Sequence, residues 1–420
     1  MNSKHFIIEH FFRHEYGNLT ALLSRKFGIA HLELIEDSIM EAMFKAMKVW
    51  SFSKIPDNPQ AWFYKVAHNK IIDQLRRDQK STTQIMSSTE ELQMPDDDEI
   101  QDEWLKLIFA CCHPMLKDQE QLMLSLKLVC GLNAKEISIA LQKSEAATKR
   151  ALTRAKANFK EKLKGREIPE IKDSHQSLQS VLKVIYLLFN EGYKATSDKL
   201  LIKKEICEEA LRLAFILEEN NFAALFEIRS LIALMCFKAS RFDARLNEQG
   251  GAITLEEQDR SKWNKTLIQT GYDYLLQASN EESICDYFLE AAIESHYAVS
   301  QSFAEINWKD ILVIYDYLLK IKCSQIVKLN RLIALEKVFG AKAALLELEA
   351  LEATYDLEDN YLFHLIKSDM LQKIDKKALS VLHLKKAIKL SSNAIERNFL
   401  EKKLESLSKK DINAPSRTSS

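Results

Sequence analysis

The chain has 420 residues, enough for two or three domains with hydrophobic cores of their own. Hydrophobic residues make up 46% and charged residues 28%, which is ordinary for a soluble globular protein, whereas nine glycines and six prolines are too few for a turn-rich all-β or doubly wound fold. Lysine and arginine (59) nearly balance aspartate and glutamate (60), so any affinity for nucleic acid must come from local segregation of charge. We therefore expect an all-α protein.

Disulfides, membrane spans and metal sites are not expected. The seven cysteines are irregularly spaced. The start has no signal-peptide pattern, because residues 5–12 already form an interrupted amphipathic run, and no apolar run approaches the roughly 18–20 residues of a membrane span. Cys111, Cys112 and His113 are adjacent but point in different directions on one helix, and no second cysteine pair follows, so we predict no metal and no cofactor. The expected location is a reducing cytoplasm.

The first segment, residues 1–80, is predicted to contain three or four amphipathic helices. Apolar residues repeat at helical spacing from Phe6 to Phe27 and again from Leu32 to Trp50. A loop is expected over residues 51–59, which contain two prolines and an Asp-Asn pair.

The next predicted helix carries an aromatic ring beside polar and charged side chains. The residues that fall within about 80° of one another on its helical wheel are Trp62, Lys65, Asn69, Asp73 and Arg76. An aromatic ring beside cations can stack bases and hold the backbone of a single strand. A core tryptophan beneath a solvated charged face has the same pattern, so this helix alone leaves both interpretations open.

Residues 81–103 lack periodicity and become acidic, which predicts a flexible linker. Two helices broken at His113-Pro114 then lead into residues 132–163, which are typical of a helix-turn-helix. In this motif Asn133 and Glu136 can form a capping box at the first helix, and Ser144 can cap the second.

The second helix of this motif is far more basic than the first. The apolar stripe that should face the core comprises Leu152, Ala155, Phe159 and Leu163, with Thr148 at its edge. The opposite side comprises Lys149, Arg150, Thr153 and Arg154, and the charge is extended along the flank by Lys156 and Lys160. Such a face suits a phosphate-lined groove, although a solvated face on a core helix has the same composition.

Residues 178–407 contain a succession of shorter helical segments. Small residues (Ala334, Ala343, Ala387) where neighbours would cross favour helical hairpins, and the period after Asn307 is close to the roughly 34 residues of a tetratricopeptide unit. We predict a tetratricopeptide-like helical-repeat domain with a protein partner, followed by a disordered tail at residues 408–420.

Two of these motifs, in this order, resemble the extracytoplasmic-function (ECF) subfamily of the sigma-70 family of bacterial sigma factors. The segment NPQAWFYKVAHNKIIDQLRR at residues 58–77 resembles region two, and ALTRAKANFKEKL at residues 151–163 resembles region four. Upstream, Leu34 to Asp37 and Trp50 resemble the family's polymerase-binding helix, with Met40 where members usually carry glutamine. NEGYKA, EEALRL and LEEQDRSKW, beginning at residues 190, 208 and 255, resemble a subgroup with a long tetratricopeptide-like extension.

The resemblance implies a role for each segment. Residues 1–80 would bind core RNA polymerase and the minus-ten element, residues 104–166 the minus-thirty-five element, and residues 178–407 would be regulatory. The polymerase would be bound through the clamp helices of its largest subunit and its flap, with the clamp contacts made by Glu36, Asp37, Met40 and Glu41. The minus-ten DNA would contact Trp62, Lys65, Asn69, Asp73, Arg76 and Arg77. The upstream duplex would contact Ser144, Glu145, Lys149, Arg150, Thr153, Arg154 and Lys156.

The resemblance thus predicts a non-enzymatic sigma factor that directs core polymerase to promoter DNA and helps to melt the minus-ten element. A free-standing helix-turn-helix regulator with a helical-repeat sensor domain is the alternative, but it leaves the Trp62 face and the acidic segment unexplained. An enzyme is disfavoured, because no histidine has a paired nucleophile or a glycine-rich phosphate loop. The histidines considered were His10, His14, His68, His113 and His296.

Overall fold

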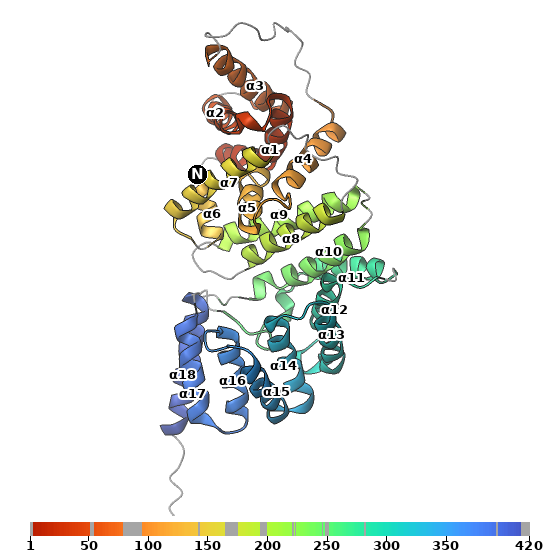
Figure 1. Ribbon diagram of the computed structural model, residues 1–420, viewed down its shortest axis with the longest axis vertical. Coiled ribbons are helices and arrows are strands. Elements are labelled where there is room, and N and C mark those ends of the chain that lie inside the picture. Colours follow the sequence, from red (N-terminus) through yellow and green to blue (C-terminus); the bar gives the residue numbers. More distant parts are fainter. Residues whose placement is uncertain are drawn as a thin grey trace, which may run out of the picture. The chain divides into compact units, whose positions relative to one another are not determined.

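The computed structural model describes residues 3–50, 54–78, 95–141, 143–163, 175–193, 200–220, 222, 224–245, 247, 252–280, 283–391 and 394–412. Its α-helices there run from α1 to α18 (Figure 1), which confirms the all-α prediction. The chain forms two compact units, Met1–Glu191 and Gly192–Ser420. None of the described helices is long and apolar enough to cross a membrane.

The first half of unit 1 is a helical cluster built from amphipathic helices. They are α1 (Ser3–Phe27), α2 (Leu32–Trp50) and α3 (Pro59–Asp78). Each of these helices packs on the other two, because each carries apolar side chains every three or four residues on one face. Their shared core includes Tyr16, Leu19, Leu23, Ile35, Ile39, Ala42, Trp50, Phe63, Ala67 and Ile71.

The second half of unit 1 includes the residues predicted to form a helix-turn-helix. Its elements are α4 (Asp97–Cys111), α5 (Asp118–Leu124), a π-helical turn (Ser125–Val129), α6 (Ala134–Ala140), α7 (Glu145–Leu163) and α8 (His175–Tyr193), which crosses the boundary between the units. The long helix α7 packs against both α5 and α6, and α1 of the first half packs against α4. The predicted break at His113-Pro114 lies between α4 and α5.

The acidic segment predicted as a linker over residues 81–103 ends inside a helix. Residues 97–103 form the start of α4, where the Asp96 carboxylate caps the helix by accepting a 2.8 Å hydrogen bond from the Glu99 amide. Carboxylates are favourable in the first turn of a helix, and Ile100 is buried in the core of unit 1. The start of α4 was not predicted, because these residues are polar and have no visible periodicity. Residues 79–94 lie outside the described part.

Unit 2 is a succession of helices that pack on their neighbours in the chain. They are α9 (Leu200–Glu219), α10 (Leu225–Ser240), α11 (Lys265–Ser279), α12 (Asp286–Val299), α13 (Trp308–Ile321), α14 (Gln325–Phe339), α15 (Ala341–Thr354), α16 (Tyr361–Lys373), α17 (Lys377–Leu390) and α18 (Ala394–Ile412). At the tight joint between α14 and α15, Gly340 has φ of 85°, a conformation that side chains other than glycine rarely adopt. Helical hairpins are thus present, while the tetratricopeptide-like repeat stays a prediction.

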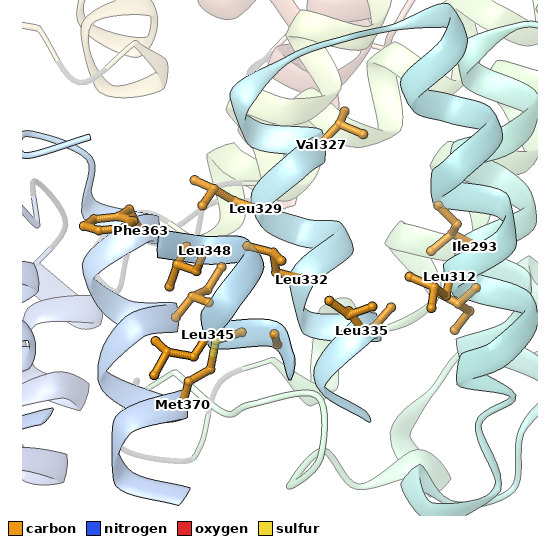
Figure 2. Close-up of a cluster of buried hydrophobic side chains, with 14 of the residues drawn as sticks. Ile293, Leu312, Val327, Leu329, Leu332, Leu335, Leu345, Leu348, Phe363 and Met370 are labelled. Atoms are coloured by element: carbon orange, nitrogen blue, oxygen red, sulfur yellow. The ribbon is translucent and has the colours of Figure 1, made fainter. Parts of the chain in front are cut away.

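Helix α14 is central to a core of unit 2 whose buried residues come from α12 to α16. Figure 2 shows Leu335 of α14 directed toward Leu312 of α13, and Leu332 directed toward Leu345 of α15. Phe363 and Met370 of α16 complete the same cluster of buried side chains. A continuous core of this kind is what stacked helical hairpins produce, because no hairpin can bury its apolar faces alone.

The predicted disordered tail over residues 408–420 begins within a helix. Helix α18 continues to Ile412, and its residues Phe399, Leu400, Leu404 and Leu407 pack in a small core with α16 and α17. Because these residues are packed, α18 extends into polar residues 408–412, which their composition assigned to the tail. Residues 413–420 lie outside the described part.

Candidate nucleic-acid and polymerase interface

Helices α6 and α7, predicted to form a helix-turn-helix, have the capping pattern expected from the sequence. The Asn133 amide donates to the Glu136 carboxylate at 2.8 Å, and the Glu136 amide donates to the Asn133 side chain at 3.0 Å. At the start of α7, the Ser144 hydroxyl accepts a 3.2 Å hydrogen bond from the Ala147 amide. Both helices therefore begin where capping side chains satisfy backbone N–H groups that have no partner inside the helix.

The two faces of α7 also follow the prediction. The buried residues of this helix are Thr148, Leu152, Ala155, Phe159 and Leu163. The exposed residues near its start and on its opposite face include Ser144, Glu145, Lys149, Arg150, Thr153 and Arg154. Thr148 faces the core although it directly precedes the basic residues Lys149 and Arg150, because its wheel position continues the Leu152 stripe.

The exposed side of α7 carries cations that are available to a ligand. Lys149 forms an ion pair with Glu145 one turn earlier at 2.7 Å, and this hydrogen-bonded lysine lowers the pKa of the Glu145 carboxyl. Arg150 and Arg154 have no ion-pair partner among the described residues. A guanidinium on an exposed helix face can bind phosphate or a guanine edge bidentately.

Lys156, predicted to lie with these cations, is positioned differently. Its ammonium group forms an ion pair with Glu36 of α2 and its side chain is mostly buried. One turn further on, Lys160 forms an ion pair with Glu33 of the same helix. These two lysines on the flank of α7 are therefore paired with glutamates of α2, while Lys149, Arg150 and Arg154 remain exposed.

The face of α3 predicted to contact single-stranded DNA combines a packed ring with exposed polar groups. The Trp62 indole is half-buried, with ring centroids 5.0 Å from Trp50 and 5.5 Å from Phe63. The exposed side chains on this helix include Lys65, Asn69, Asp73, Arg76 and Arg77. Both interpretations of this helix apply in part, since Trp62 packs against the core and is still partly exposed on a helix that carries exposed cations.

The loop before α3 is organised by side-chain contacts with the backbone. The Asn58 side chain accepts a 2.9 Å hydrogen bond from the Ala61 amide, which caps α3. Lys54 and Asp57 form an exposed ion pair at 3.1 Å. These contacts place an ordered polar turn, residues 54–58, at the end of α3 that carries Trp62.

The residues of α2 predicted to bind polymerase differ in their exposure. Asp37 and Glu41 are exposed, Met40 is half-buried, and Glu41 forms an ion pair with Lys70 of α3 at 2.7 Å. Glu36, in contrast, is only 5% exposed.

Three groups from distant parts of unit 1 surround the Glu36 carboxylate. The Tyr16 hydroxyl donates to it at 3.3 Å, the Lys127 ammonium lies 3.5 Å away, and Lys156 forms the ion pair described above. Burial and the Glu36 charge together raise the pKa of Tyr16, which keeps this phenol protonated as a donor.

One residue of this face was missed by the sequence prediction. Phe44 is 63% exposed, although it is a large apolar residue, and it lies on α2 one turn after Met40 and Glu41. The sequence contained a usable signal for it. Phe44 follows Met40 by four residues and Glu41 by three, and residues at these spacings lie on the same face of a helix. Exposed apolar side chains beside polar groups are typical of interaction surfaces.

The Cys111-Cys112-His113 sequence is part of the structural core. Both cysteines are buried, and burial raises the pKa of the Cys112 thiol to about 12, which disfavours the thiolate that a metal would need. The His113 ring accepts a hydrogen bond from the Met115 amide at 3.2 Å. Within the described ranges, no three His, Cys, Asp or Glu side chains are grouped to hold a metal ion.

Comparison with known proteins gives two domain matches. Residues 11–81 match the model for sigma-70 region 2, and residues 177–279 match the model for a family of unknown function (DUF6596). A protein of Rhizobium meliloti (strain 1021), named as uncharacterized, is 30% identical over 386 residues, which cover 90% of each chain. No solved structure matches the chain. A sigma-70 region 2 domain indicates involvement in transcription initiation, within a family that is not enzymatic.

Proposed function

We propose, for a chain that belongs to the same family as this Rhizobium meliloti protein and carries a sigma-70 region 2 domain, the role of an ECF-type sigma factor. It binds core RNA polymerase, directs the enzyme to specific promoters and helps to melt the minus-ten element. The observation that supports this most directly is the face of α3 within residues 11–81, where a half-exposed Trp62 shares one side of the helix with Lys65 and Arg76.

In this proposal α7 enters the major groove of the minus-thirty-five element. Arg150 and Arg154 contact base edges or phosphates, and Lys149 and Thr153 lie on the same face. Phosphate contacts of this kind position the helix on the duplex, while base contacts select the sequence.

The minus-ten element is opened at α3 and the turn formed by residues 54–58. A base leaving the stack costs a few kcal/mol, which must be offset by new contacts such as stacking on an aromatic ring. Trp62 supplies that ring, and Lys65, Arg76 and Arg77 supply charges for the displaced backbone.

The polymerase docks on α2 through Asp37, Met40 and Glu41, with the clamp helices and the flap as its contact elements. Acidic side chains on an exposed helix complement basic groups on a partner and speed its encounter. The helices of unit 2 regulate this activity, as the resemblance to the subgroup with a tetratricopeptide-like extension implies.

The test is transcription in vitro with purified core polymerase and DNA from the protein's own genome, followed by mapping of the start sites. We expect specific initiation only when protein and core are combined, and weak binding of duplex promoter by the protein alone. Initiation that never depends on the protein would disprove the proposal. Strong footprints on DNA without polymerase would instead favour the free-standing regulator.

The regulatory role of unit 2 is tested in the same assay. A chain ending after Arg166 and a chain ending after Glu191, the boundary between the units, are compared with the full-length protein. Transcription should change in both truncated forms. Unchanged transcription would remove unit 2 from the mechanism.

A further inference from the structure

The loop between α10 and α11 in unit 2 carries two buried hydrogen-bond donors that have no acceptor. They are the terminal nitrogen Nη2 of Arg260 and the indole nitrogen Nε1 of Trp263, and neither has a hydrogen-bond partner among the described residues. Trp263 as a whole is only 4% exposed. Buried donors in proteins nearly always have a partner in the chain, a bound water, an ion or a ligand, because an unpaired one is costly.

The Arg260 guanidinium is held in place by contacts that leave Nη2 unused. Its central carbon lies 4.5 Å from the centroid of the Trp263 ring. Its other terminal nitrogen, Nη1, donates to the backbone carbonyls of Tyr297 at 2.7 Å and Ser300 at 2.6 Å, at the end of α12. Nη1 alone caps that helix end, so capping does not account for Nη2. Because a guanidinium is planar, these contacts also fix the direction of the unpaired nitrogen.

The surroundings of these donors are positively charged. The Arg241 guanidinium also lies near the Trp263 ring, with 5.7 Å between its central carbon and the ring centroid, but its own carboxylate partner is Glu294. The described contacts of Arg260 are with carbonyl groups and a ring and include no ion pair. Burial and the charge of Arg241 lower the pKa of Arg260, and the charge of Glu305 opposes that shift. An anion beside Arg260 would compensate its charge.

We propose that Arg260 and Trp263 form a binding site for the carboxylate group of a small ligand. One carboxylate oxygen accepts from Nη2 of Arg260 and the other accepts from Nε1 of Trp263. A carboxylate fits because both unpaired groups are donors, whereas an ionised carboxylate only accepts and has two oxygens. The site lies within residues 177–279, which match the family of unknown function, and it gives unit 2 a ligand of defined chemistry.

An enclosed water molecule is the other candidate occupant. Gln258, two residues before Arg260, has a buried side-chain oxygen with no partner among the described residues, and water can donate to such an oxygen as well as accept from nitrogen. Water carries no charge, however, and would leave the Arg260 charge uncompensated near Arg241. Electrostatics therefore favours the carboxylate, and titration with acetate distinguishes the two occupants.

The test is a titration of the full-length protein in which sodium acetate replaces sodium chloride at constant ionic strength. The indole N–H signal of Trp263 is followed by NMR in isotope-labelled protein, and it is assigned by its loss in Trp263→Phe. We expect a saturable shift of this signal as acetate replaces chloride, because the indole gains a carboxylate oxygen as its acceptor.

Two substitutions and a matched control locate the bound acetate. Arg260→Lys keeps the positive charge but removes the planar set of donors, and it should weaken acetate binding roughly tenfold. Trp263→Phe keeps a ring but removes the indole donor. Acetate should raise the urea midpoint of unit 2 in the wild type, because it binds the folded state, and should not do so in Trp263→Phe. The control is Lys262→Gln, which removes an exposed charge from the same turn and should respond like the wild type.

An indole signal that stays unchanged as acetate replaces chloride would leave water as the occupant and overturn the carboxylate site. Equal acetate binding by the wild type and Arg260→Lys, or an equal rise of the urea midpoint in the wild type and Trp263→Phe, would place the acetate elsewhere and overturn it as well. If Arg260→Lys does not fold, the urea midpoints of Trp263→Phe and Lys262→Gln decide the result. Because neither polymerase nor DNA is present, none of these outcomes bears on the proposed sigma-factor role.

Discussion

The indole rings of Trp62 and Trp50 lie 5.0 Å apart, with Trp50 almost fully buried and Trp62 only half-buried. Trp50 also contacts Phe63 edge-on at 5.2 Å, so the ring at the surface rests on a rigid aromatic base. A surface ring held in this way loses little conformational entropy when a base stacks on it, which favours binding through preorganisation.

The Trp62→Ala substitution should therefore affect promoter opening more than folding. The half-buried ring should cost about 1–3 kcal/mol of unfolding free energy, less than the roughly 3–5 kcal/mol expected for fully buried Trp50→Ala. Unfolding in urea measures the stability, and thymine reactivity with permanganate in the minus-ten region measures opening. Trp62→Phe should retain most of both, and normal opening by Trp62→Ala would exclude a stacking role.

Arg154→Ala should weaken promoter binding by the holoenzyme nearly uniformly across sequences if this side chain contacts phosphate. The slope of log affinity against log salt concentration should then fall in magnitude by about one, because one fewer counterion is released. Lys183→Ala, on an exposed residue of α8, is the control and should leave the slope unchanged. A sequence-dependent loss with an unchanged slope would assign Arg154 to base contacts instead.

Thr148→Val should stabilise unit 1 and leave promoter binding as it is. The Thr148 hydroxyl is buried and has no hydrogen-bond partner among the described residues, so replacing it with a methyl group should raise the unfolding free energy by about 1 kcal/mol. Thr153→Val on the exposed face is the matched substitution and should change binding rather than stability. If folded Thr148→Val bound the promoter more weakly, the side of α7 that faces DNA would have been assigned wrongly.

Arg241 in unit 2 should be needed for folding because it neutralises a mostly buried carboxylate. It is 8% exposed, forms an ion pair with Glu294, and its guanidinium carbon lies 5.7 Å from the centroid of the Trp263 ring and 5.8 Å from that of Tyr297. Arg241→Met should cost about 3–5 kcal/mol, since Glu294 remains unpaired. Adding Glu294→Leu should recover part of that loss, as a double-mutant cycle measured by urea unfolding would show. If nothing is recovered, Arg241 contributes to stability mainly by stacking on the rings and not by its charge.

Unit 2 should lose stability as the pH falls below the usual histidine range. Burial, followed by the nearby charges of Lys367 and His364, lowers the pKa of His383 to about 4. The unfolded chain, with an ordinary histidine pKa of about 6.5, then binds more protons than the folded chain. Stability contributed by neutral His383 is therefore present above pH 6.5 and decreases toward pH 4, by at most about 1.4 kcal/mol per pH unit.

This dependence is measured as the urea midpoint of unit 2 over a pH series. His383→Gln has no ring proton to gain and should show a flatter profile between pH 6.5 and 4. It should also be less stable at pH 7, because the 2.9 Å hydrogen bond between the His364 and His383 rings is lost. Parallel profiles for the wild type and His383→Gln would contradict the assignment.

Much of the local structure could be read from short patterns. The caps at Asn133 and Ser144, the buried Thr148 stripe and the exposed Arg150 and Arg154 were all predicted, because capping and helical periodicity depend on residues only a few positions apart. The same locality explains the incorrect start of α4, since its acidic first turn has no apolar repeat and is recognisable mainly through the cap at Asp96.

The environment of Glu36 could not be read in this way. By sequence it is another acidic residue beside Asp37, but in the fold its partner Lys156 is 120 positions away and Lys127 comes from a π-helical turn. Such pairings depend on where the fold places distant helices, and packing of distant helices is set by the shapes of whole faces rather than by any single motif. Periodicity therefore identified both helices, and the tertiary structure buried a predicted docking residue, Glu36, in contact with Tyr16, Lys127 and Lys156.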